Sequence, residues 1–169
     1  MFSKIALVTG LLAAPLASAH SFFNGIHAPK NLAPGQNFTV TVGSESTTQQ
    51  IENILIVFGL TPAGTDHAGI LGSEVLRETY LGPSDVPFPS SQGYNDITND
   101  SPFSMYVPAN FTKGEAVLTV STLSLTSEYH APDLDFFNVT VNVGDVAGAS
   151  DEIVSGEKAT SVFYGFKGF

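Results

Sequence analysis

The sequence of 169 residues contains no cysteine, no tryptophan and few basic residues. The absence of cysteine excludes a disulfide framework, a thiol nucleophile and a thiolate zinc site. The absence of tryptophan removes one of the flat aromatic side chains that carbohydrate-binding sites favour. Because no disulfide can help, the domain must be stabilised by its hydrophobic core, to which 13 phenylalanines can contribute.

The charge balance is strongly acidic, with 6 basic against 16 acidic residues and a formal net charge of −10. Nucleic acid binding requires clustered Lys and Arg to neutralise phosphates, so the composition disfavours it. Attraction to an anionic membrane surface is disfavoured for the same reason. The chain also lacks a G-x-S-x-G elbow and a phosphate-binding glycine loop, so we expect neither a hydrolase of that type nor a cofactor.

The N-terminus has the pattern of a secretory signal peptide. Lys4 supplies a positive charge, residues 5–16 are apolar, and Ala17-Ser18-Ala19 has the small residues that a signal peptidase reads. The apolar run is too short to span a bilayer. We therefore predict a signal peptide over residues 1–19 and a secreted chain that begins at His20.

Period-two alternation of apolar and polar residues, typical of half-buried strands, recurs along the chain. It predicts strands at 38–42, 103–107 and 137–143, and another from 116 to 125 with a bulge or bend near Ser121, where the apolar phase shifts. Further segments are a first strand at 22–26, a fully apolar central strand at 54–58 and an ambiguous segment at 75–81.

These segments predict an all-β fold, an immunoglobulin-like β-sandwich of about seven antiparallel strands, and a small barrel remains an alternative. We place this domain at residues 20–144 and expect an acidic and aromatic C-terminal tail at 145–169, in which the alternation is lacking. The segment 82–102 is rich in proline and acidic residues and predicts a long loop.

Three sequons predict N-glycosylation at Asn37, Asn110 and Asn138. Asn37 and Asn138 have the parity of the polar side of their strands, and Asn110 falls in a predicted turn. All three are therefore expected to face solvent.

An N-terminal histidine offers an amine and an imidazole, which together with a second histidine could hold copper in a brace. His20 would be that residue, and the candidates for the second ligand are His27, His67 and His130. We keep a copper protein as an alternative. A carbohydrate-binding sandwich at the cell surface is a second alternative.

Several stretches in order resemble the fungal necrosis-inducing secreted protein 1 family. They are Gly25-Ile26-His27-Ala28-Pro29, Leu32-Ala33-Pro34-Gly35-Gln36, Val57-Phe58-Gly59, Leu71-Gly72, Tyr80-Leu81-Gly82-Pro83, Val107-Pro108-Ala109, Lys113-Gly114-Glu115-Ala116 and Phe137-Asn138-Val139-Thr140-Val141 with Gly144-Asp145. The resemblance implies a secreted effector that binds plant immune receptor-associated kinases, both receptor-like co-receptors and cytoplasmic kinases, and suppresses pattern-triggered defence. Some members cause plant cell death.

The sequence therefore predicts a secreted, extracellular binding protein and not an enzyme, with the host cytoplasm, after delivery, as an alternative place of action. Binding energy at protein interfaces is concentrated on a few exposed aromatic residues. The candidates for partner contact are Tyr80, Phe88, Tyr94, Tyr129, Phe163, Tyr164, Phe166 and Phe169.

Overall fold

The structure, a computed structural model, describes residues 20–47, 49, 51–64, 68–81, 101–145 and 152–163. The predicted signal peptide and nearly all of the predicted loop at 82–102 lie outside these residues. Among the described residues no helix is long and apolar enough to cross a membrane.

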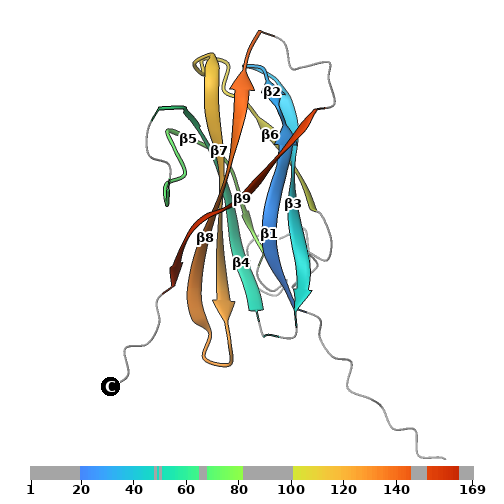
Figure 1. Cartoon of the computed structure of the whole chain (residues 1–169), viewed down its shortest axis with the longest axis vertical. Coiled ribbons are helices and arrows are strands. Elements are labelled where there is room, and N and C mark those ends of the chain that lie inside the picture. The colour runs from blue at the N-terminus through green and yellow to red at the C-terminus, as the bar shows by residue number, and fades with distance from the viewer. Residues whose placement is uncertain are drawn as a thin grey trace, which may run out of the picture.

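The described chain forms nine strands and confirms the all-β sandwich, with two strands more than the about seven of an immunoglobulin-like domain. Figure 1 shows them as two packed layers. The strands are β1 (His20–Pro29), β2 (Asn31–Leu32), β3 (Asn37–Thr47), β4 (Ile51–Pro62), β5 (Glu74–Tyr80), β6 (Ser101–Tyr106), β7 (Gly114–Thr126), β8 (Ala131–Val143) and β9 (Ile153–Phe163).

The strand order is β5-β4-β7-β8-β9-β1-β3-β6, with the short β2 added in parallel to β8. One layer holds β5, β4, β7 and β8, and the other holds β1, β3 and β6. Every second side chain along these strands points inward and fills the space between the two layers. Phe137, Val139 and Val141 of β8 are buried in the core, while Thr140 between them is exposed.

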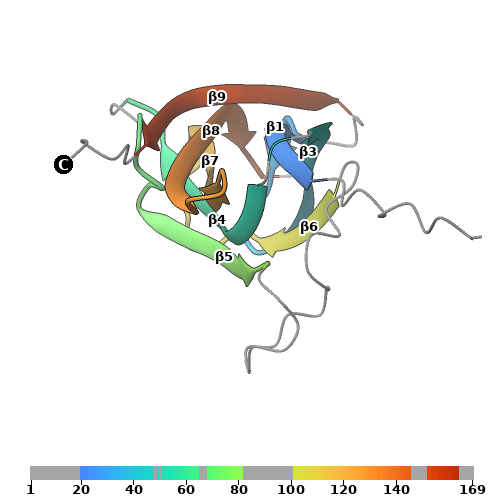
Figure 2. The same ribbon diagram turned by 90° about the horizontal axis from the view of Figure 1, so that it is seen from below.

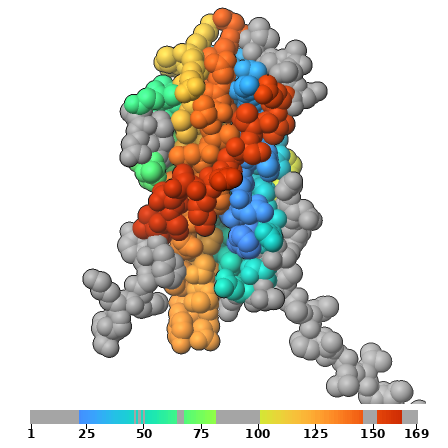
Figure 3. All heavy atoms as spheres, in the orientation of Figure 1, coloured from blue at the N-terminus to red at the C-terminus, as the bar shows by residue number. Residues whose placement is uncertain are grey.

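β9 joins the two layers on one side of the molecule. Its first residues pair with β1, from Ile26↔Gly156 to Pro29↔Ile153, and its later residues pair with β8, from Asn138↔Glu157 to Asp133↔Phe163. Figure 3 shows this strand crossing over β8 toward β1. The segment after residue 144, in which the sequence shows no alternation, therefore contributes a strand to the sandwich over residues 153–163.

The alternation is lacking because β9 lies in a shallow position. Of the β9 side chains that the structure describes, only Val154 packs on the central core, and most others are exposed, so no apolar alternation is required. The strand is held mainly by backbone pairing. Gly156 permits its close approach to β8, because a Cβ there would collide with the backbone carbonyl of Asn138.

The bulge expected near Ser121 is absent, since β7 pairs with β8 without a register shift from Gly114 to Thr126. The apolar phase shifts because Leu123 faces outward, where it lines a hollow of about 340 Å³ together with Leu134 and Phe136. The register shift opposite this part of β7 lies in β4, between Asn53 and Leu55. The ambiguous segment at 75–81 is a strand.

The sheet stops short of closure on the side opposite β9. β5 pairs only with β4, and β6 pairs only with β3, among the strands that the structure describes. Figure 2, which looks along the sandwich, shows β5 and β6 adjacent at this open side and β9 across the far side. We call the space between the β5 and β6 edges the seam.

Candidate partner-binding site

The turn that joins β7 to β8 has an unusual backbone. Within this turn Ser127 has φ 63° and His130 has φ 51°, the only non-glycine residues with positive φ among those described. The left-handed region is costly for residues with a Cβ, by about 1 kcal/mol each. The turn is closed by a hydrogen bond from the His130 N–H to the Ser127 carbonyl oxygen at 3.1 Å. We call Ser127–His130 the hairpin tip.

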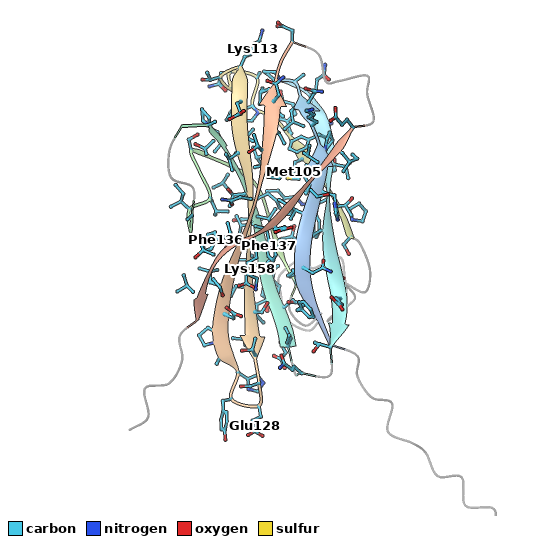
Figure 4. All side chains as sticks on the ribbon, in the orientation of Figure 1. Met105, Lys113, Glu128, Phe136, Phe137 and Lys158 are labelled. Atoms are coloured by element: carbon cyan, nitrogen blue, oxygen red, sulfur yellow. The ribbon has the colours of Figure 1, made fainter. Side chains whose placement is uncertain are left out.

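The hairpin tip presents a tyrosine to solvent. Tyr129 is 71% exposed, the highest fraction among the exposed large hydrophobic residues that the structure describes. Its backbone N–H donates to Ser127 Oγ at 3.4 Å, so the strained turn sets its direction. Figure 4 shows the tip, marked by Glu128, at the far end of the sandwich from Lys113.

The surroundings of Tyr129 are polar and acidic. Gln49, from the connection between β3 and β4, lines an open hollow together with Thr126 and the residues Ser127 to Tyr129. Glu52 at the start of β4 lies 3.5 Å from His130 Nε2. An exposed tyrosine that follows Glu128 on an acidic hairpin tip suits a partner pocket that carries basic or hydrogen-bond-donating groups.

A second candidate, Tyr80, lies at the seam. It is half-buried at the end of β5 and lines a small cleft of about 120 Å³ with Arg77, Thr79, Leu81, Ser101, Pro102 and Phe103. Tyr80 and Tyr129 thus belong to two different surfaces. No sequence pattern indicates a role for Arg77. The signal available was that it is the single arginine of the chain.

Arg77 spans the seam from the inner face of β5. It pairs in register with Phe58, and residues opposite each other on paired strands share a face. Its guanidinium carbon lies 5.4 Å from the centroid of the Phe103 ring on β6, within the range of a cation–π contact. Its Nη1 donates to the carbonyl oxygen of Ser104 at 2.9 Å, and its Nε donates to Thr79 Oγ1 at 3.1 Å.

The remaining predicted contact aromatics are not brought together by the described structure. Phe163 ends β9 opposite Asp133, and its side chain lies outside the described residues. The other five also lie outside them: Phe88, Tyr94, Tyr164, Phe166 and Phe169.

The histidines considered for copper are dispersed where the structure describes them. His20 and His27 lie seven positions apart on β1, which at the rise of a strand is roughly 20 Å, so they cannot share one ion. His27 Nδ1 is 2.8 Å from Ser155 Oγ on β9. His130 belongs to the hairpin tip, and His67 and the His20 side chain lie outside the described part. The described residues contain no group of three or more His, Cys, Asp or Glu that could hold a metal.

The three sequons differ in exposure. Asn37 starts β3 and Asn110 lies in a turn, and both are exposed. Asn138 lies on the outer side of β8, as its parity predicts, but it is half-buried and pairs in register with Glu157 of β9. Glycosylation stays a prediction at all three, with Asn138 the least accessible.

These features define a small β-sandwich protein without a recognisable catalytic constellation in its described part, whose exposed tyrosine tip is suited to protein contact. The comparison with known families assigns it more closely. The model of the Nis1 family matches residues 19–142, and the chain belongs to this family.

Two relatives from one genus are similar over most of the chain. A necrosis-inducing secreted protein 1 of Colletotrichum orbiculare is 35% identical over 77% of this chain and 73% of its own length. A protein of the same name from Colletotrichum higginsianum is 30% identical over 85% of this chain and 90% of its own. The resemblance seen in the sequence is thereby confirmed, and the chain is a secreted protein.

Among solved structures, a cellulose-active polysaccharide monooxygenase from M. thermophila aligns with a TM-score of 0.43 and 15% identity. The alignment covers 72% of this chain but only 56% of the monooxygenase chain, so this chain spans about half of that protein's length.

Proposed function

We propose that the chain is an effector-like binding protein, not an enzyme, that binds immune receptor-associated kinases of a plant and suppresses pattern-triggered defence. Promotion of host cell death is part of the same proposal. Its support is family membership, since both curated relatives carry the name necrosis-inducing secreted protein. The kinase class of the partner comes from the family resemblance.

The structural observation that carries the binding part is the projection of Tyr129 from a strained turn. Left-handed backbone at two non-glycine residues costs free energy, and such strain concentrates at functional sites. A tyrosine is a rigid amphipathic group that loses little conformational entropy on binding, which makes it a frequent anchor at interfaces. An acidic tip also complements a basic partner surface and would speed association.

The test compares two exposed tyrosines of this chain. The chain from His20 to Phe169 is assayed by surface plasmon resonance against the ectodomain and kinase domain of a receptor-like co-receptor and against a cytoplasmic receptor-associated kinase. Tyr129→Ala should weaken binding by about 30-fold, as loss of a hot-spot residue does. Tyr106→Ala is the matched control, because Tyr106 is 49% exposed on β6, away from the tip, and its variant should bind as the unmodified chain does.

The same three proteins are then expressed in leaves, with the defence oxidative burst and cell death as readouts. We expect the unmodified chain and Tyr106→Ala to suppress the burst and Tyr129→Ala to fail. Equal binding and equal suppression by Tyr129→Ala would remove the tip from the proposal. No kinase binding by the folded, unmodified chain would overturn the kinase partner itself.

A further inference from the structure

Arg77 differs from the other described cations in its lack of a carboxylate partner. Lys30 contacts Glu152 at 2.8 Å, Lys158 contacts Asp135 at 2.6 Å, and Lys113 contacts Asp145. No described carboxylate forms an ion pair with Arg77, although the protein carries 16 acidic residues. Arg77 is also half-buried, whereas those three lysines are exposed, and a charge withdrawn from water ordinarily has a partner.

The guanidinium retains hydrogen-bonding capacity. Of its five N–H groups, one at Nε is directed to Thr79 Oγ1 and one at Nη1 to the Ser104 carbonyl oxygen. Three N–H groups remain, and no described residue accepts from them. A planar guanidinium with donors left over matches a carboxylate, which accepts in bidentate geometry.

The seam also limits what can reach Arg77. Its cleft of about 120 Å³ has room for a carboxylate head group and few other atoms. The strongly acidic chain repels polyanions and anionic membranes at long range, so a single carboxylate within an otherwise uncharged segment is the favoured ligand.

The walls of the seam are strand edges, which favour an extended ligand. The Ser104 carbonyl points away from β3 toward Arg77, and Pro102, two residues earlier, has the same backbone direction and no N–H to offer. The β6 edge is thus poorly suited to adding a strand. The β5 edge has no described strand beyond it and can accept one by backbone pairing.

We propose that the seam is a binding site for an extended partner peptide, which pairs along the β5 edge and places one aspartate or glutamate carboxylate on Arg77. This inference is independent of the identity of the host target, because it depends only on Arg77 and the two strand edges.

The single arginine makes a direct test simple. In the folded chain from His20 to Phe169 labelled with ¹⁵N, one arginine Nε–Hε NMR signal arises, and it reports Arg77. The probe is the blocked peptide acetyl-Val-Asp-Val-Thr-amide, with acetyl-Val-Asn-Val-Thr-amide as its neutral match. We expect the aspartate peptide to shift the signal saturably and the asparagine peptide to bind roughly tenfold more weakly or not at all, since one charge-assisted hydrogen bond is lost.

Two substitutions of Arg77 separate the contribution of its planar guanidinium from that of its charge. Arg77→Gln should abolish the backbone amide shifts on β5 that the aspartate peptide causes. Arg77→Lys should weaken the binding of that peptide by about tenfold. Lys113→Gln, which removes the same charge at a distant exposed site, should leave the affinity unchanged. The peptide comparison on the unmodified chain stands even if an Arg77 variant does not fold.

Four results would overturn the proposal. They are the absence of any shift, equal shifts from both peptides, equal binding by Arg77→Gln, and tighter binding of a phosphoserine peptide than of the aspartate peptide. A fifth would be a shift of the Arg77 signal when Asp100, the residue before β6, is changed to Asn without peptide, because the counter-ion would then belong to the chain.

Discussion

Arg77 Nη1 of β5 donates a hydrogen bond of 2.9 Å to the backbone carbonyl oxygen of Ser104 on β6, and this contact joins the two edges of the unclosed sheet. The Arg77 side chain thus connects β5 and β6, which are not hydrogen-bonded strand neighbours in the described sheet. The guanidinium lies over Phe103, whose ring in turn packs 5.0 Å from that of Phe58 in the core. The seam is therefore both a structural joint and the proposed ligand site.

Replacement of Arg77 by Ala should lower the free energy of unfolding by about 1–2 kcal/mol, because a charged hydrogen bond and a cation–π contact are lost at a half-buried position. Arg77→Lys should recover part of this loss through its charge. Urea denaturation followed by tyrosine fluorescence measures the difference. A change of less than about 0.5 kcal/mol for Arg77→Ala would show that the contact does not stabilise the seam.

Lys158 and Lys113 form ion pairs of different burial, which makes them a matched set. The Lys158 partner Asp135 is 15% exposed, whereas the Lys113 partner Asp145 is 82% exposed. Lys158 Nζ also lies 5.9 Å from the centroid of the Phe137 ring. Figure 4 places Lys158 and Phe137 together where β9 crosses β8.

Lys158→Gln should therefore cost about 1–2 kcal/mol of stability, since it leaves a shielded carboxylate unpaired, and Lys113→Gln less than about 0.5 kcal/mol. Thermal unfolding of both variants side by side gives the comparison. Equal melting temperatures of the two variants would mean that the Asp135 carboxylate is hydrated to the same extent as that of Asp145.

The C-terminal boundary can be tested by two truncations. A chain of residues 20–147 lacks β9, which pairs with both β1 and β8, and should lose cooperative unfolding. A chain of residues 20–163 keeps every described strand and should unfold cooperatively, like the longer chain. Circular dichroism and proteolysis distinguish them, and a cooperatively folded 20–147 chain would show that β9 is dispensable.

The strain of the hairpin tip predicts an uncommon response to substitution. Ser127→Gly should retain or raise stability, because glycine adopts positive φ without penalty. Ser127→Val should lower it by about 1–2 kcal/mol, since a β-branched residue disfavours that backbone. If partner binding falls in Ser127→Gly while stability does not, the turn acts by orienting Tyr129. If both variants have the stability of the unmodified chain, the backbone strain at Ser127 is not significant.

The parts of the fold that the sequence predicted are those in which burial dictates residue type. Alternation at Phe137, Val139 and Val141 arises because one side of β8 meets the core. The rule of apolar and polar alternation failed for β9, since Ser155, Glu157 and Ala159 are exposed. This strand forms by backbone pairing, which leaves no pattern in the residue types. The rule also misplaced a bulge at Ser121, because both faces of β7 carry apolar residues.

The candidate sites, too, could be predicted only where a local sequence pattern marks them. Tyr129 could be predicted as exposed because it lies between polar residues in a turn. The positive φ of its neighbours Ser127 and His130 could not, because neither is a glycine, the residue type that marks such positions in a sequence. Tyr80 of the seam was among the predicted contact residues, but Arg77 could not be predicted, because the seam brings together residues 77 and 104 from edges that are not hydrogen-bonded strand neighbours. Such proximity follows from the packing of the two layers and not from local pattern.

The placement of β9 also constrains how the protein is exported. β1 is the first strand described and β9 the last, and they pair with each other. A chain that crosses a membrane from its N-terminus therefore delivers β1 long before the strand that covers its edge. Until residue 163 has emerged, the edges of β1 and β8 remain open to pairing with other chains, which makes late translocation the step most exposed to aggregation and to chaperone control.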